Sequence, residues 1–420
     1  MNNWLRGIVL SGMALSLAGS AVAQTGAANA RSLAMGGAYS AVARGVEAPR
    51  WNPANLGLYD APAFSMNLVG VGAAVSNNSF SKKDYDLYNG AYLTPALKTE
   101  ILNKIPDDGL RVDLNSQVEL LGFSWRRLAL SLSAESAADL RLSRSFMEVA
   151  LNGNQLDKVY DFSDTGGEAF AISKVGLSYG HAVFVPFLRD FAIGATLNYV
   201  QGLAQAQVVD AYGVMGTTFD GSFGDARARV RHSRGGSGFA ADLGIAAVVN
   251  ERLRVGVAIR NLWSSVQWKK DVKLGEYGVR VDSLTVQAVD ESSADSLIDD
   301  YSDEYDGDPY SASLPAELCI GGAYRMGRLL VAADYVQGFS DRPGVSRTPM
   351  LAVGTELRLL SFLPLRLGVA FGGNAGTSSG AGFGLRLGGF EFNVAASNRS
   401  GLLPGKSGGL GFALGMRIGV

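Results

Sequence analysis

The last eleven residues constrain the fold of this chain more than any other segment. Large apolar side chains stand at every second position, at Leu410, Phe412, Leu414, Met416, Ile418 and Val420, and small residues or Arg417 stand between them. Because successive side chains of a strand point to opposite faces, the pattern predicts one wholly apolar face and one small or charged face. Such a strand suits a barrel wall between lipid and a polar lumen better than a packed core.

Six pairs of segments repeat this alternation, and a connection of only a few residues joins the members of each pair. The pairs are 117–124 with 128–135, 171–184 with 191–200, 239–249 with 253–263, 317–326 with 328–337, 350–359 with 364–372, and 381–387 with 390–397. A first strand near 62–75 and the final strand at 410–420 bring the expected number to about fourteen, an even count typical of bacterial barrels. The sequence therefore predicts an all-β fold, a closed antiparallel transmembrane β-barrel.

The order of the connections supports the same fold. Short turns fall on one rim of the expected barrel, together with both chain ends, and long connections fall on the other rim. A secreted β-sandwich also alternates, but nothing in that fold would sort long and short loops by parity. Closure of the barrel removes every unpaired strand edge from lipid.

Composition excludes several other classes. After residue 24 no segment contains the 18 or so consecutive apolar residues that a membrane-spanning helix needs. The chain has one cysteine, Cys319, which rules out a framework of internal disulfides. A formal net charge of -2 and a pI near 5.8 lack the basic footprint of nucleic-acid binding.

Residues 1–23 have the layout of a signal peptide. A single basic residue, Arg6, precedes an apolar stretch over 8–17, and the small-residue motif Ala21-Val22-Ala23 stands before Gln24. The apolar stretch is about half the roughly 20 residues of a spanning helix. We therefore expect export, cleavage before Gln24, and localisation in the outer membrane of a Gram-negative cell.

Four long connections, 76–115, 137–169, 201–237 and 270–315, are expected to be extracellular. Residues 94–102 predict a short helix with Pro95 in its first turn, and 140–151 predict another. The stretch 290–308 contains nine acidic residues and no basic one. It fits either a solvated loop or a calcium site, although no recognisable ligand spacing marks the latter.

Charged side chains within the strands keep a consistent phase, opposite to the apolar face. They are Asp242, Arg254, Arg260, Arg325, Asp334, Glu356, Arg358, Arg366, Arg386, Glu391 and Arg417. An Arg at the bilayer midplane costs roughly 2–4 kcal/mol in a barrel, so this set should face the lumen. Two interpretations stay open: paired charges that brace a plugged interior, or the lining of an open, solute-selecting pore.

The sequence offers little for catalysis. Its two histidines, His181 and His232, lie far apart in the chain, and no Cys or His cluster has metal-ligand spacing. The many Gly-x-Gly pairs lie within expected strands and not at a strand-to-helix turn that would bind phosphate. We therefore expect no catalytic residue, no cofactor-binding residue, no metal ligand and no nucleic-acid partner.

Two motifs near the expected mature N-terminus carry a resemblance to a known family. Residues 30–39 read Ala-Arg-Ser-Leu-Ala-Met-Gly-Gly-Ala-Tyr, and residues 51–57 read Trp-Asn-Pro-Ala-Asn-Leu-Gly. Together they resemble the opening of the FadL/PorV superfamily of outer-membrane β-barrels. Residues 314–318, Leu-Pro-Ala-Glu-Leu, and 363–368, Leu-Pro-Leu-Arg-Leu-Gly, look like further phrases of that superfamily, and the layout looks closest to its poorly characterised members.

The resemblance implies a fourteen-stranded barrel, residues 59–420, whose N-terminal segment 24–58 folds inward as a plug. It places Asn52, Pro53 and Ala54 near a gate. Glycines at 36 and 37 would permit a tight backbone approach, and the residue before a proline avoids helix, so Asn52-Pro53 should turn. A purely structural cork fits the same residues. Val420 departs from the terminal aromatic residue common in such barrels.

The resemblance implies two functions. One is a gated channel for hydrophobic or amphipathic small molecules, fatty-acid-like, with an apolar pocket inside the extracellular end. The other is an interaction barrel that docks a periplasmic or secreted protein, with a solid plug and no such pocket. Shared fold alone does not settle which of these functions the chain has. In either case we expect a monomer in contact with outer-membrane lipid.

Overall fold

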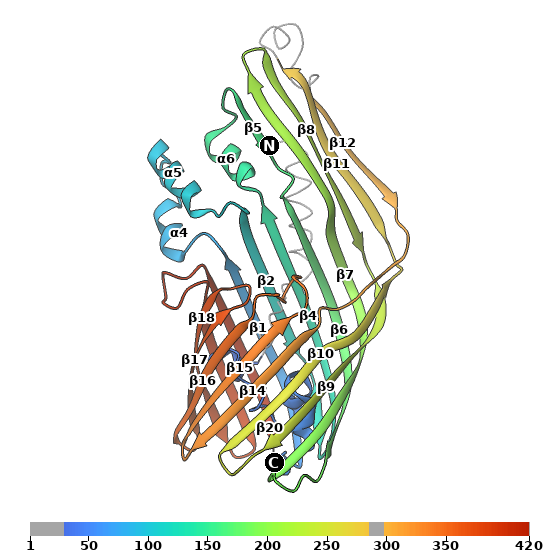
Figure 1. The fold of residues 1–420 in the computed structure, drawn as a ribbon, viewed down its shortest axis with the longest axis vertical. Helices are drawn as coiled ribbons and strands as arrows, with labels where there is room; N and C mark the ends of the chain where they lie inside the picture. The colour runs from blue at the N-terminus through green and yellow to red at the C-terminus, as the bar shows by residue number, and fades with distance from the viewer. Residues whose placement is uncertain (1–28, 285–297, 420) are drawn as a thin grey trace.

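A computed structural model describes residues 29–284 and 298–419, and the expected signal peptide lies outside these residues. The strands form one closed antiparallel barrel of fourteen strands (Figure 1). The last strand closes on the first in a register that runs from Ser65 opposite Gly419 to Ser76 opposite Gly409. The predicted fold and all six predicted hairpins are confirmed.

The barrel strands follow one another in chain order. They are β1 (Phe64–Asn77), β2 (Leu110–Glu119) with its continuation β3 (Gly122–Trp125), β4 (Leu128–Leu142), β6 (Gly166–Ala182), β7 (Asp190–Thr218), β9 (Gly236–Val248), β10 (Leu253–Trp268), β14 (Glu317–Met326), β15 (Leu329–Gly338), β16 (Met350–Leu360), β17 (Leu363–Gly372), β18 (Thr377–Leu387), β19 (Phe390–Arg399) and β20 (Gly409–Gly419).

The second barrel strand is interrupted at Leu120 and Leu121. Both of its pieces, β2 and β3, pair with β1 and with β4. The register against β4 shifts by one residue between the pairs Glu119–Ser133 and Phe123–Leu130, which is a β-bulge. The barrel wall is therefore irregular at this level, a few residues above the short turn.

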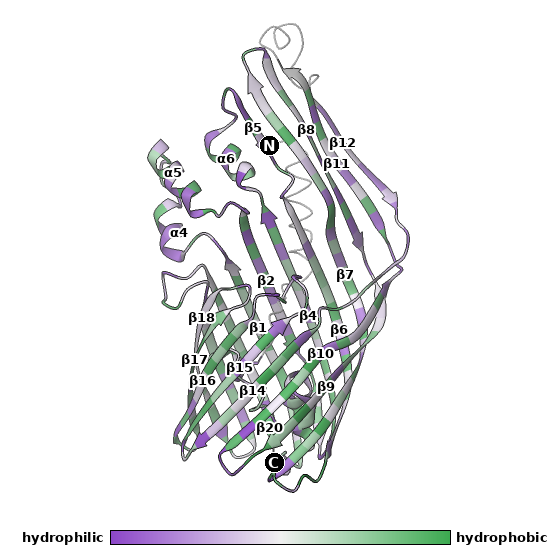
Figure 2. Ribbon diagram, viewed as in Figure 1, coloured by the Kyte–Doolittle hydropathy of each residue, from purple (hydrophilic) through white to green (hydrophobic). Residues whose placement is uncertain are grey.

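The prediction that 201–237 and 270–315 are loops is wrong, because most of their residues lie in strands. β7 is 29 residues long, and above the barrel it pairs with β5 (Lys158–Asp161) and β8 (Gly221–Ser233). β8 pairs with β11 (Lys273–Leu284), which pairs with β12 (Ile298–Asp306). These strands build a tall wall on one side of the long-loop rim (Figure 1). Outside the bilayer neither face of a sheet must be apolar, so the alternation fades while pairing continues, as the mixed colours of this wall show (Figure 2).

Short helices lie in the long connections, at the long-loop end of the barrel. They are α4 (Lys82–Tyr88), α5 (Pro95–Lys104) and α6 (Arg144–Asn152). The prediction of α5 is confirmed, and its N-cap Thr94 accepts a hydrogen bond from the Leu97 amide. The helix expected from 140 begins only at Arg144, because residues 140–142 complete β4. α4 was not predicted, although Ser81 and Asp84 form a capping box. Within the described residues, no helix is long and apolar enough to cross a membrane.

Residues 29–58 lie inside the barrel, near its short-turn end (Figure 1). We call them the plug segment. It contains α2 (Ala30–Ala34), the 3₁₀ turns η1 (Gly45–Glu47) and η2 (Pro53–Leu56), and α3 (Ala48–Trp51). α2 contacts β17 to β20, whereas η2 contacts β6, β7 and β9 on the opposite wall. The segment therefore spans the lumen.

Candidate functional site

The plug segment approaches the barrel wall most closely at glycines. A Cβ atom at Gly36 would lie 2.8 Å from the backbone nitrogen of Val369, and the positive φ of +66° also favours glycine there. On the wall, a Cβ atom at Gly368 would overlap the backbone of Met35. Gly37, with φ of +97°, has more room. The main chain of the Met35–Gly36 turn therefore packs directly against the main chain of the wall, with no room for a side chain at Gly36 or Gly368.

A buried charge network, which we call the plug lock, joins the plug segment to β16 through β20. Arg31 donates to Glu47 at 3.0 Å and to Glu356 of β16 at 3.4 Å. Glu47 also pairs with Arg417 of β20. Further bonds at 2.6–3.2 Å connect Arg366 to Glu356, Arg366 to Glu391 and Arg417 to Glu391. Each buried charge of the lock thus has partners of opposite sign, as burial requires.

Asp334 of β15 binds the plug segment through its main chain. Its carboxylate accepts hydrogen bonds from the amide of Tyr39 at 3.0 Å and that of Ser40 at 2.8 Å. The Tyr39 ring packs edge to face against Trp51, with ring centroids 5.4 Å apart. The Asp334 carboxylate thus extends the plug lock to a fifth strand of the wall, β15, on the same side of the barrel.

The Asn-Pro-Ala motif contacts the opposite wall. The Asn52 amide donates to the Ile245 carbonyl at 2.8 Å, and its side-chain oxygen accepts from the Ala54 amide at 3.0 Å, which caps η2. A Cβ atom at Gly194 would overlap Pro53 and Ala54. The motif is thus seated on β7 and β9, and its role at a gate stays a prediction.

The remaining strand charges of the expected lumen set have the following partners. Arg254 pairs with Asp60 of the plug-to-barrel linker at 2.5 Å, Arg260 with Glu317 at 3.1 Å, Arg358 with Glu356 at 2.6 Å, Arg386 with Glu391 at 3.3 Å, and Asp242 accepts from the Asn198 amide at 2.8 Å. Arg325 is half-buried and has no ion pair among the described residues. Paired charges therefore dominate this interior.

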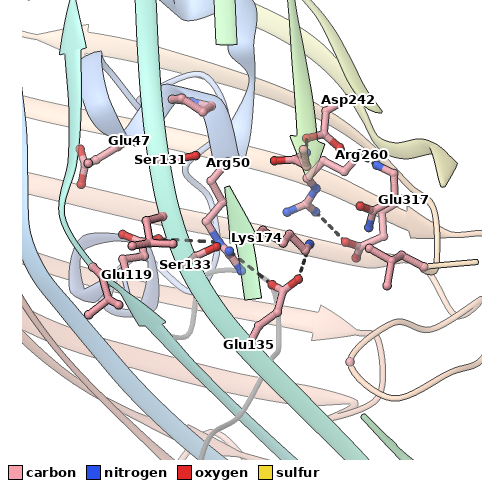
Figure 3. A pocket seen from close by; sticks show the side chains of 18 of the residues that line it. Glu47, Arg50, Glu119, Ser131, Ser133, Glu135, Lys174, Asp242, Arg260 and Glu317 are labelled. Carbon is pink, nitrogen blue, oxygen red and sulfur yellow. Dashed lines mark hydrogen bonds and ion pairs between the residues drawn. The ribbon is translucent and has the colours of Figure 1, made fainter. Parts of the chain in front are cut away.

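A cavity of about 130 Å³ lies between the plug segment and the wall of β2, β4, β6, β9 and β10 (Figure 3). On one side, Arg50 of the plug segment lies 3.9 Å from Glu119 and 3.6 Å from Glu135, which also pairs with Lys174. Asp242, the Arg260–Glu317 pair and Glu47 of the plug lock complete the charged lining. Five of these residues were not predicted as site residues: Arg50, Glu119, Glu135, Lys174 and Glu317. The last four lie on the lumen phase of their strands, which is a signal that could have indicated them.

An apolar cluster lies next to this cavity toward the long-loop end. It consists of Ile172, Val200, Ala240, Val266 and Trp268, with Phe170, Tyr310, Ala312 and Leu314 packed against them. Phe170 and Leu314 also line the cavity. The expected apolar pocket is thus a side-chain-filled cluster, and the open space beside it is charged.

A turn of the connection between β15 and β16 covers the cavity. Pro343, Gly344 and Val345 line it, and Arg342 fixes the turn by donating to the Ser313 carbonyl at 2.6 Å and to Glu168 of β6 at 3.2 Å. We call residues 339–349 the lid. At its other side the cavity reaches Leu120 and Gly122, where the barrel wall is interrupted.

The two histidines lie apart. His181 is exposed on the outer face beside Tyr179, 3.3 Å from its hydroxyl, and His232 lies on β8, 3.8 Å from Glu304. Among the described residues, no three His, Cys, Asp or Glu side chains are grouped as metal ligands. Part of the acidic stretch 290–308 lies outside these residues.

Comparisons with known proteins agree with this geometry. The chain belongs to the family described as "Family of unknown function (DUF5723)", whose model matches residues 53–397. No curated protein matches the sequence.

Solved structures of transporters share the fold. The toluene transporter TbuX of Ralstonia pickettii is 14% identical, with 93% of this chain and 97% of that chain covered at a TM-score of 0.53. A FadL homologue of Pseudomonas aeruginosa is 14% identical, with 96% of this chain and 99% of that chain covered at a TM-score of 0.53. The toluene transporter TodX of P. putida is 12% identical, with 93% of this chain and 98% of that chain covered at a TM-score of 0.50. The predicted FadL-like barrel is confirmed as a fold.

Proposed function

We propose that this member of the DUF5723 family is an outer-membrane channel that passes amphipathic small molecules beside its plug segment. The observation that carries the proposal is the direct contact between an apolar cluster and a charged cavity on one sector of the lumen. A cavity whose charged side chains adjoin apolar ones such as Phe170 and Leu314 suits a ligand with a polar head and an apolar tail. A pure hydrocarbon would have to desolvate the charged lining without compensation.

The attachment of the plug segment supports a route on the same sector. Bonds of 2.8–3.4 Å to Asp334 of β15 and Glu356 of β16, together with the Glu47–Arg417 pair to β20, hold it to one side of the barrel. Arg50, by contrast, reaches β2 and β4 only at 3.6–3.9 Å. Space and weak contacts therefore coincide between the plug segment and β2, β4 and β6. From there the cavity reaches the interruption at Leu120–Leu121, where the register of the wall shifts.

The proposal includes the assignments that the sequence suggested. Residues 24–58 act as the plug, and Asn52, Pro53 and Ala54 act as its fixed seat beside the passage. The protein is exported with cleavage before Gln24 and is a monomer, with the long loops extracellular. N-terminal sequencing of the mature protein and light scattering of the purified barrel test the cleavage and the monomer.

An interaction barrel is the second candidate, favoured by the tall wall. β12 pairs only with β11 among the described residues, and a free strand edge can accept a strand of another protein. A docking barrel of this kind predicts no uptake of small molecules by the intact protein.

Uptake into phosphatidylcholine liposomes tests the channel. Two probes with the same tail and opposite permanent charge, hexyltrimethylammonium and hexanesulfonate, cross lipid poorly unaided. We expect the intact protein to admit at least one of them with little ionic conductance, and a variant lacking residues 30–58 to conduct ions strongly. The folding of both proteins is checked by heat-dependent gel mobility. Absence of uptake by the intact protein, or of extra conductance in a folded deletion variant, contradicts the proposal.

A further inference from the structure

The charges that line the cavity do not balance. Of its five carboxylates, Glu47 is neutralised within the plug lock by Arg31 and Arg417. The other four, Glu119, Glu135, Asp242 and Glu317, face the three cations Arg50, Lys174 and Arg260. One negative charge is therefore in excess among the described residues of the lining.

The least compensated carboxylate is that of Glu119. Glu135 pairs with Lys174, Glu317 pairs with Arg260 at 3.1 Å, and Asp242 accepts from the Asn198 amide at 2.8 Å and from a backbone amide at 2.6 Å. Glu119 has one ion pair, with Arg50 at 3.9 Å, which is beyond hydrogen-bond distance. Its side chain is nevertheless only 20% exposed. A buried carboxylate with so distant a partner favours a further positive charge nearby.

Arg50 is the group with which such a charge would compete. The guanidinium lies between Glu119 and Glu135 and contacts neither at hydrogen-bond distance, and its Nε atom has no hydrogen-bond partner (Figure 3). Phe170 contributes an aromatic ring to the same lining, and aromatic faces attract cations.

We propose that the cavity binds the cationic head group of an amphipathic ligand, an ammonium group, through Glu119 and Glu135. This inference rests on the proposed channel and names the class of molecule that it selects. An ammonium head restores the charge balance of the lining, whereas a carboxylate or sulfonate head doubles the excess. The alkyl tail lies toward Phe170 and Leu314, at the border of the apolar cluster.

The same geometry couples the ligand to the plug segment. A cation at Glu119 replaces Arg50 in its ion pairs, and these pairs connect the plug segment to β2 and β4. Binding therefore weakens the plug segment's attachment on the side where the cavity lies and leaves the plug lock intact. Glu119 and Arg50 are specificity residues with opposite effects.

Calorimetric titration of the full protein in phosphatidylcholine nanodiscs, beside liposome uptake, tests the inference with hexyltrimethylammonium and hexanesulfonate. We expect binding and uptake of the cation to exceed those of the anion by about tenfold or more, of the order of one unit charge at a partly solvated site. Glu119→Gln should reduce this preference to about twofold or less. Arg50→Gln should tighten cation binding, because it removes the competitor.

The matched control is Glu148→Gln, which removes a carboxylate paired with Lys158 at the long-loop end, outside the lumen. It should keep the preference of the unchanged protein. The head-group inference is overturned, and the channel is left standing, if the two probes bind equally or the anion binds better. The same holds if the preference survives Glu119→Gln and Arg50→Gln has no effect on cation binding. Uptake of neither probe overturns the channel and the inference together.

Discussion

Substitution of Glu47 by glutamine should release the plug segment. The carboxylate is 8% exposed and lies at the centre of the plug lock, where it accepts from Arg31 at 3.0 Å, Asn29 at 2.8 Å and the Tyr39 hydroxyl at 2.8 Å, and pairs with Arg417. The glutamine amide keeps the shape and loses the charge. Arg31 and Arg417 are then buried with fewer counter-charges.

Removal of one partner from a buried ion pair costs about 3–5 kcal/mol. The lower end applies here, because Arg417 keeps Glu391 at 2.6 Å and Arg31 keeps Glu356 at 3.4 Å. A loss of about 3 kcal/mol changes an equilibrium constant roughly a hundredfold. The fraction of barrels with a released plug segment should rise by that factor, which planar-bilayer recording measures as the open probability of large conductance events.

A surface pair gives the control for this measurement. Asp86→Asn breaks an ion pair with Lys82 in α4. The Asp86 and Lys82 side chains are 57% and 60% exposed, and such surface pairs contribute at most about 1 kcal/mol to stability. Its open probability should stay unchanged. Adding Arg417→Gln to Glu47→Gln removes one of the uncompensated cations and should recover part of the closed population. A folded Glu47→Gln barrel that stays as closed as the unchanged protein would refute the lock.

Three further substitutions test other parts of the molecule. Ser40→Cys should form a disulfide with the native Cys319, whose thiol lies beside the Ser40 side chain. The oxidised protein should keep its uptake of the hexyl probes, because the proposed passage lies on the other side of the lumen. Loss of uptake that reduction restores would show that the plug segment must leave. Glu168→Gln should open the lid by removing the charged partner of Arg342, so that Val345→Cys in a Cys319→Ser background reacts faster with an impermeant maleimide than it does beside an unchanged Glu168. Equal rates would contradict a role for the Arg342–Glu168 bond in holding the lid. Leu367→Arg, on the lipid-facing side, should destabilise the barrel by about 2–4 kcal/mol in denaturant titration, and a loss below about 1 kcal/mol would contradict its placement in the bilayer.

The barrel strands were predictable because lipid imposes a strict rule on every second side chain. Leu410 and Phe412 are exposed on the outer face, as their alternation predicted, and their neighbours point inward. Above the membrane this rule ends. In β8, Arg227, Arg229 and Arg231 alternate with the small or medium residues Ala226, Ala228 and Val230, and β12 has acidic residues on both faces. Neither strand therefore shows the stripe of large apolar side chains that marks the barrel strands.

A change of phase in the sequence marks the bulge in the second strand, although this segment was predicted as one regular strand of a hairpin. Outward positions are even up to Leu120 and odd from Leu121 through Trp125, so the phase switches where two leucines adjoin. Strict alternation cannot continue across such a switch, because a shift of one residue turns every following side chain to the other face. The phase of the apolar residues before this switch therefore predicts that Glu119 faces the lumen.

The contacts of the plug segment could not be derived from the sequence. The phase of Glu356 and Arg366 predicted that they face inward, but their partner Arg31 lies 325 residues from Glu356 along the chain. Which inward charge meets which depends on barrel closure and on the path of the plug segment, and neither has a local signature. The charged character of the cavity follows from the same closure, since Arg50 meets Glu119 only there.

The distribution of contacts around the plug segment favours passage beside it over its expulsion. To leave the lumen, the segment would have to break the whole plug lock, in which Arg31 and Arg417 both pair with Glu47. To admit a ligand beside it, only the long ion pairs of Arg50 need to yield. Breaking one buried charge pair costs several kcal/mol, and breaking several in succession would make opening too rare for transport. A lock on one side and a charged cavity on the other therefore fit a plug that stays docked and yields only along β2, β4 and β6.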